Sequence, residues 1–199
     1  MAADSADRVT AARDSIGEKL EKAVLDFGAK PGSEIFLRAF KQEKRLELWM
    51  KKDSVFNLFR SYPICFVPGK LGPKRKQGDL QVPEGVYFID RFNPKSNYHL
   101  SLGINYPNES DRLFADKEKP GGDIFIHGDC VSIGCIPIED EKIEEVYLLA
   151  LDATTGGQER IFVHIFPFLL DDMNLQNMLD GHFLNIENSR FWENLQQVY

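Results

Sequence analysis

The sequence predicts an α+β fold in which β-structure predominates, with one helix at the N-terminus and further helices at the C-terminus. Apolar residues recur at helical spacing near the start, alternate in a strand-like pattern from about residue 34, and return to helical spacing after residue 139. With 199 residues, 43% hydrophobic and 28% charged, the chain can bury the core of a globular protein. We divide it into an N-terminal helical extension, 1–30, and one domain, 31–199, which includes the C-terminal helices.

The first thirty residues or so predict an amphipathic helix. Apolar side chains lie three or four positions apart and so share one helical face: Val9, Ala12, Ile16, Leu20, Val24 and Phe27. Gly28 is a natural stop, and Pro31 with Gly32 breaks the chain after it. We expect this helix either to pack on the domain or to present the domain to its surroundings.

The middle of the chain predicts sheet and loops. Alternating apolar residues between residues 34 and 67, with polar breaks at 41–44 and 51–54, indicate an antiparallel meander. Residues 68–85 are rich in Gly and Pro and predict a loop, without the residue order of a phosphate-binding loop. Two more strands are expected at 86–91 and 98–104. The polar segment 105–122 predicts a long loop of the kind that lines or covers a site.

The last third returns to helical patterns around one strand. We expect a helix at 139–153, a strand at 160–166 and two helices at 171–179 and 190–199. A short buried strand should end near Ile126, which would put His127 at its tip.

Charge and hydropathy exclude several classes of partner. A net charge of −7 argues against nucleic acid, and no apolar run is long enough to be a transmembrane segment. One basic cluster contains Lys70, Lys74, Arg75 and Lys76. It is either a solvated loop or a patch that meets an anionic substrate.

Residues 124–138 hold the strongest chemical signal. His127, a flexible Gly134 and Cys135 lie between two apolar runs. An imidazole beside a thiol can remove its proton and leave a nucleophilic thiolate. The alternative interpretation of Cys135 is an inert, buried cysteine.

A metal site and a redox-active cysteine pair are less consistent with the same stretch. His127, Cys130 and Cys135 provide three ligands at most, and no second Cys/His cluster completes a zinc site, so we expect no metal and no cofactor. Cys130 and Cys135 also lack the spacing of a thioredoxin-like pair. We interpret Cys65 and Cys130 as inert buried cysteines, with an oxidative Cys130–Cys135 disulfide as the alternative.

Several motifs in order resemble one family. His127-Gly128 followed by Ser132-x-Gly134-Cys135 is similar to the catalytic signature of the L,D-transpeptidases with a YkuD-type domain. The YafK-like murein branch of that family is the nearest in pattern, through Tyr-Pro-Ile-Cys at 62–65, Leu-Gly-Pro-Lys at 71–74, Gln-Val-Pro-Glu-Gly at 81–85 and His-Gly-Asp-Cys at 127–130. The resemblance covers about 34–199. It implies a mixed β-sandwich or barrel catalytic domain that acts on peptidoglycan.

The resemblance also implies roles for the site residues. Cys135 would attack a stem-peptide carbonyl, and His127 would be the general base. The backbone carbonyl of Ser132 would orient His127 and complete a triad. The amides of Gly134 and Cys135 would form the oxyanion hole.

Substrate contacts are implied at Gly128, Tyr98 and Tyr106, although buried strand aromatics are the other interpretation of the two tyrosines. The thioester would be resolved by an amine, which gives cross-linking, or by water, which gives a carboxypeptidase or an amidase that releases wall-anchored protein. Ile133 and Pro137 stand where many members carry His and Arg, and a catalytically silent wall-binding module is the rival from another class. Access to the wall implies a periplasmic or otherwise extracytoplasmic location, with a signal peptide already removed.

Overall fold

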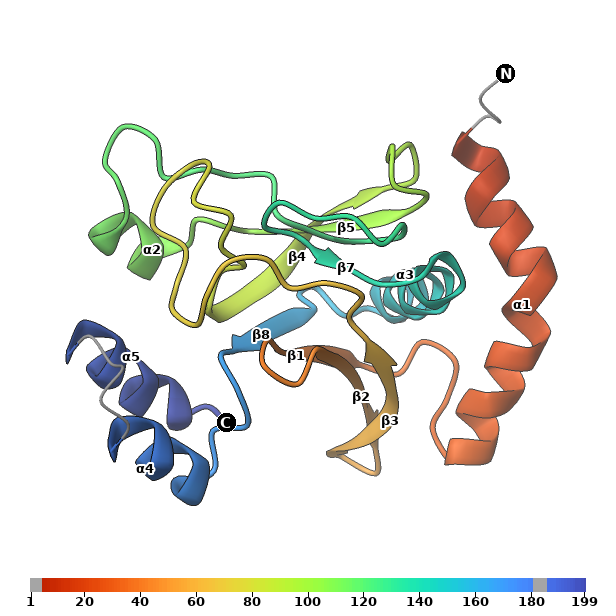
Figure 1. Ribbon diagram of the computed structural model, residues 1–199. Helices are drawn as coiled ribbons and strands as arrows, with labels where there is room; N and C mark the ends of the chain where they lie inside the picture. The colour runs from red at the N-terminus through yellow and green to blue at the C-terminus, as the bar shows by residue number, and fades with distance from the viewer. Residues whose placement is uncertain (1–4, 181–185) are drawn as a thin grey trace.

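A computed structural model describes residues 5–180 and 186–199, and within them eight strands form one curled sheet with helices at both ends (Figure 1). In chain order the elements are α1 (Ser5–Phe27), β1 (Ile35–Phe40), β2 (Arg45–Lys52), β3 (Val55–Pro63), β4 (Gly85–Asn93), β5 (Ser101–Ile104), α2 (Glu109–Phe114), β6 (Phe125–His127), β7 (Ile136–Pro137), α3 (Asp140–Thr155), β8 (Phe162–Phe166), α4 (Asp172–Asp180) and α5 (Ile186–Gln196). The predicted α+β class and the terminal helices are confirmed.

The sheet joins local and distant strands. Its order is β3-β2-β1-β8-β4-β5-β6-β7. The first three strands form the predicted antiparallel meander. Strand β8 enters between β1, to which it is parallel, and β4, to which it is antiparallel. The short strands β6 and β7 run parallel at the far edge, and this pairing brings the two ends of the His/Cys stretch together.

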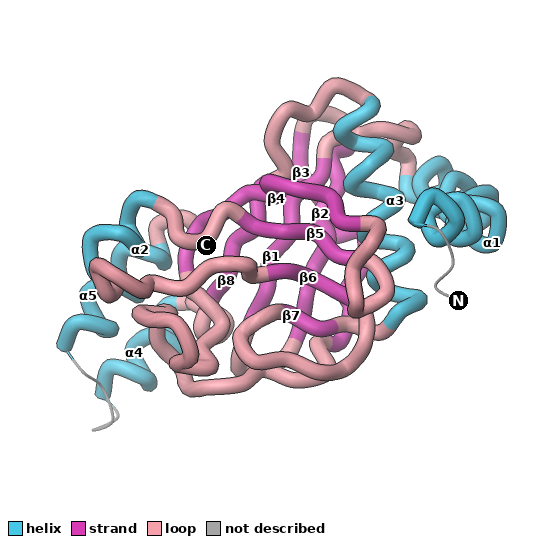
Figure 2. Tube along the Cα trace, turned by 90° about the horizontal axis from the view of Figure 1, so that it is seen from above, coloured by secondary structure: helices cyan, strands magenta, loops and turns pink. Residues whose placement is uncertain are grey.

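The helices cover different parts of the sheet. Figure 2 shows α1 packed outside α3 at one end, whereas α2, α4 and α5 gather at the other. Ala12, Leu20 and Val24 of α1 are at most 3% exposed and belong to the main hydrophobic core. A second core forms around Trp192, which is fully buried. No helix in the described residues is both long and apolar enough to cross a bilayer.

Three local expectations differ from the structure. Strand β3 ends at Pro63 instead of continuing to residue 67, and β5 begins at Ser101, so Tyr98 lies in a loop. The segment expected to be one long loop contains the helix α2. Its signal is a capping box, in which Asn108 and Asp111 satisfy each other's backbone amides.

Candidate active site

His127 ends strand β6 and is 2% exposed. Its Nδ1 lies 2.5 Å from the carbonyl oxygen of Gly128. Burial lowers the pKa of the imidazole, and the bond to Gly128 opposes this lowering. Because a carbonyl only accepts, Nδ1 carries the proton in the neutral ring and Nε2 is left unprotonated. The carbonyl that contacts His127 in this structure belongs to Gly128, whereas the resemblance implied that of Ser132.

Cys135 is the free thiol among the described cysteines. Strand β7 begins directly after it, and the Phe125 amide donates to its Sγ at 3.4 Å. Burial raises the pKa of the thiol, while the Phe125 amide and the positive charge of Lys74 lower it. Within the described residues no hydrogen bond joins His127 to Cys135, although both line one cavity. The resting pair is thus a neutral thiol and a neutral imidazole.

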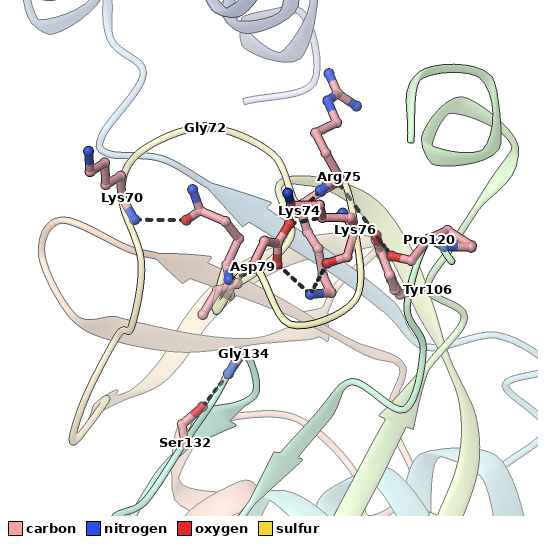
Figure 3. Close-up of polar contacts among 12 residues, drawn as sticks. Lys70, Gly72, Lys74, Arg75, Lys76, Asp79, Tyr106, Pro120, Ser132 and Gly134 are labelled. Carbon is pink, nitrogen blue, oxygen red and sulfur yellow. Dashed lines mark hydrogen bonds and ion pairs between the residues drawn. The ribbon is translucent and has the colours of Figure 1, made fainter. Parts of the chain in front are cut away.

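The turn before Cys135 is held by the side chain of Ser132. Its Oγ donates to the Cys135 carbonyl at 2.8 Å and accepts from the Gly134 amide at 3.0 Å, the second bond being drawn in Figure 3. Gly134 has a φ of 144°, which L side chains rarely adopt, and an added Cβ would lie 3.1 Å from the Gln81 carbonyl. The hydroxyl of Ser132 therefore shapes the turn, and the Gly134 amide is engaged in the resting protein.

Two cavities meet at Cys135. One, of about 490 Å³, is lined by Tyr98 and His127. The other, also about 490 Å³, is lined by Lys74 and the glycines of the 118–122 segment. Asp123, Ile133 and Cys135 border both cavities. A substrate group can thus approach the thiol from either side.

The implied substrate residues occupy different environments. Tyr98 is 45% exposed in its loop, and its ring centroid lies 4.8 Å from that of His127. Tyr106 is 6% exposed and lines neither cavity beside Cys135, and its hydroxyl donates to the Pro120 carbonyl. Gly128 is enclosed, since an added Cβ would lie 2.5 Å from Asp140 Oδ1. Of the three, Tyr98 alone has the exposure that substrate contact requires.

The basic cluster at residues 70–76 has one buried member. Lys74 is 4% exposed, and its Nζ donates to Asp79 at 2.6 Å and to the Lys76 carbonyl at 3.0 Å (Figure 3). The loop that carries it is fixed by Glu84, which accepts from the Gly72 amide at 2.7 Å and also from the buried Lys41 at 2.8 Å and the Trp192 indole at 2.8 Å. Sequence reasoning noted the Leu-Gly-Pro-Lys motif but gave Lys74 no position at the nucleophile.

Cys65 and Cys130 are joined by a disulfide across 65 positions of sequence. The interpretation of both as inert, unpaired cysteines is wrong, and so is the alternative of a Cys130–Cys135 bond in this state. The disulfide ties the segment after β3 to the loop between His127 and Cys135. Sequence alone could not pair them, because three cysteines allow several connectivities.

Comparison with known proteins identifies one family and a curated relative. The family model described as the L,D-transpeptidase catalytic domain, YkuD, matches residues 36–164. The YafK protein of Escherichia coli (strain K12), whose name assigns it provisionally to the L,D-transpeptidases, is 36% identical over 170 residues, 84% of this chain and 66% of that protein. This chain thus spans slightly less than two thirds of that relative's length.

Two solved structures share the fold. A point variant of the helical cell shape determining protein Pgp2 from Campylobacter jejuni has a TM-score of 0.54 at 20% identity, over 90% of this chain and 60% of that one. Bd1075 from Bdellovibrio bacteriovorus has a TM-score of 0.50 at 19% identity, over 83% of this chain and 55% of that one. With its signature residues gathered at one site and the family model matching well over half its length, the chain belongs to the family of L,D-transpeptidase catalytic domains of the YkuD type.

Proposed function

We propose that this domain is a cysteine acyltransferase that acts on peptidoglycan stem peptides, with Cys135 as nucleophile and His127 as general base. The observation that carries the proposal is one free thiol beside a buried, neutral imidazole in a shared cavity. Membership of the L,D-transpeptidase family supports the substrate class.

The chemistry follows from the resting protonation states. When the substrate carbonyl reaches Cys135, Nε2 of His127 takes the thiol proton as the C–S bond forms. The Gly128 carbonyl, which accepts from Nδ1, stabilises the imidazolium. Collapse of the tetrahedral intermediate breaks the C–N bond, and His127 returns the proton to the leaving amine. An acceptor amine or water then attacks the thioester, with His127 again removing its proton.

The oxyanion is assigned to the turn before the nucleophile. The amide of Cys135 is the first donor in this proposal. The Gly134 amide joins it when Ser132 Oγ gives up its bond to that amide, a rotation about one side-chain torsion. Because the Gly134 amide donates to Ser132 Oγ in the resting protein, it becomes available as the second donor only when substrate binds.

Substrate recognition uses the two cavities on either side of Cys135. Lys74 places a positive charge beside the thiol, where Pro137 leaves the position of the family arginine without one. Because Lys74, although paired with Asp79, also lowers the pKa of Cys135, its charge favours thiolate formation. Tyr98 offers an aromatic face on the other side.

The decisive experiment compares the native protein with Cys135→Ala and His127→Ala on purified sacculi, with muropeptides identified by mass spectrometry. New 3-3 cross-links would establish transfer. Shortened stems or released wall-anchored peptide would establish the alternative, a hydrolase of the same fold. Identical products from the native and Cys135→Ala proteins would reject catalysis and leave a wall-binding module.

The proposed location is periplasmic or otherwise extracytoplasmic. The disulfide between Cys65 and Cys130 supports it, because such bonds persist in oxidising compartments. The wall substrate requires it as well.

A further inference from the structure

Helix α1 precedes residues 36–164, which the family model matches, yet it reaches the loop that covers His127. Nη1 of Arg8 donates to the carbonyl oxygens of Ser96 at 2.7 Å and His99 at 2.5 Å. Figure 1 shows the β4–β5 connection beside the N-terminal part of α1. The contact joins residues about ninety positions apart, so it belongs to the tertiary fold.

The loop needs such a contact because its backbone is not in a relaxed conformation. His99 has a φ of 63°, in the left-handed region that residues with a Cβ enter at a cost. The His99 imidazole is held by Glu144 of α3 at 2.8 Å, and the Tyr98 amide donates to Ser96 Oγ at 3.0 Å. Arg8 supplies the charged donor for the two carbonyls, and charge-assisted bonds are the stronger kind.

The loop that contains Ser96, Tyr98 and His99 lies against His127, the proposed base. The Tyr98 ring lies 4.8 Å from the His127 ring, tilted by 36°. At Gly128 an added Cβ would lie 3.0 Å from both the Tyr98 carbonyl and His99 Cβ. Because the Gly128 carbonyl contacts His127 Nδ1, the loop touches both the face of the imidazole and the group that orients it.

We infer that α1 contributes to the active site through Arg8, a positioning residue that holds Tyr98 over His127. The inference rests on the proposed role of His127 as base. Its route is short: the guanidinium holds two carbonyls of the loop, the loop holds the Tyr98 ring, and that ring shields the imidazole from water.

Loss of this shield has a defined consequence for His127. Burial is the largest cause of its lowered pKa, so admitting water should raise the pKa toward the ordinary value. The titratable and charged groups around it are Asp129 on its own loop, Asp140 and Glu144 of α3, Tyr98 and His99 of the covering loop, and Cys135 of the turn. All of these remain in the variants below except Tyr98, where it is the residue replaced.

The test compares Arg8→Ala with Arg13→Ala by NMR titration of the His127 imidazole. Arg13 is the matched control: it lies in the same helix and binds Asp152 of α3 through two bonds, without contacting the loop. Arg8→Ala should raise the His127 pKa and slow acylation of Cys135 by a carbapenem about tenfold near the acid limb. Arg13→Ala should leave both unchanged, and Arg8→Lys should restore part of the native behaviour.

A double-mutant cycle separates positioning from general destabilisation. Tyr98→Ala should raise the His127 pKa by itself, and Arg8→Ala should then add little, since the ring it holds is gone. Full additivity of the two changes, or an Arg8→Ala titration identical to the native one, would overturn the inference. If His127→Ala leaves the acylation profile unaltered, the proposed function fails instead, while the NMR titration still decides the role of Arg8.

Discussion

The proposed nucleophile, Cys135, and the proposed base, His127, are both held in their neutral forms. Burial raises the pKa of Cys135 and lowers that of His127, so neither shift favours a resting thiolate–imidazolium pair. Cysteine enzymes that rest as an ion pair do so because the thiol pKa is depressed. In the proposed mechanism the thiolate forms as the substrate binds, and among the described residues Lys74 is the charge that favours it.

The pH dependence of thiol reactivity follows from these directions. A raised thiol pKa means a smaller thiolate fraction at neutral pH, so alkylation of Cys135 by iodoacetamide should be slow there and increase on the alkaline side. Mass spectrometry of the Cys135 peptide across pH gives the rate. Lys74→Met should displace the curve to still higher pH, because it removes a charge that lowers the pKa. A plateau of high reactivity at acid pH would instead indicate a resting ion pair.

Ser132 should matter through its hydroxyl. Ser132→Ala removes the bonds to the Cys135 carbonyl and the Gly134 amide, which together hold the turn. We expect kcat to fall by roughly fivefold to tenfold, about the value of one hydrogen bond. His127→Ala should cost about a hundredfold or more, because it removes the proton acceptor. Steady-state kinetics on a purified muropeptide compare the two, and equal losses would contradict the structural role of Ser132.

At the scale of elements, sequence patterns predict the strands that pair with their neighbours in the chain, but not the pairing of distant strands. Alternation predicted the β1–β3 meander, and the apolar run before His127 predicted a strand that ends at this residue. The insertion of β8 beside β1 joins Leu37 to Val163, a pairing that no local pattern contains.

The site shows the same division between local and distant information. His127 and Cys135 lie in one stretch, so the sequence alone can propose them together, whereas Lys74, Arg8 and the partner of Cys130 come from distant segments. The carbonyl beside His127 Nδ1 belongs to Gly128, which the resemblance did not indicate, because backbone orientation in a glycine-rich turn depends on packing, here by Asp140 and Tyr98 on Gly128.

The disulfide should stabilise the loop that carries the site. Closing a loop of 65 residues is worth about 4 kcal/mol in the chain-entropy model. Cys65→Ser with Cys130→Ser should therefore lower the free energy of unfolding by about this amount, as measured by urea denaturation. Cys135→Ser is the matched control, because it replaces a thiol outside the disulfide and should change stability little. A reductant should reproduce the loss in the native protein and have no effect on the double variant.

At the scale of the whole molecule, the boundary at residue 30 does not divide the core. Leu20 and Val24 of α1 are 3% exposed and pack in the same cluster as Ile35 of β1 and Leu149 of α3. Arg13 of α1 adds its two bonds to Asp152. The helix packs on the domain, which is one of the two arrangements expected from its sequence. A shared core implies that α1 unfolds together with the sheet.

Substitutions on the two faces of α1 test this shared core. Leu20→Ala opens a cavity in it and should cost about 2–5 kcal/mol, lowering the melting temperature of one cooperative transition in calorimetry. Leu25→Ala is the matched control in the same helix, because Leu25 is 54% exposed and its loss should stay within about 0.5 kcal/mol. If α1 instead folded by itself, calorimetry would show a minor transition at lower temperature and a main transition. Leu20→Ala would then lower the melting temperature of the minor transition alone. A single transition whose melting temperature falls in Leu20→Ala would mean that the family domain and α1 unfold as one unit. Arg8, although distant from the thiol, would then be stabilised by the same core that positions His127.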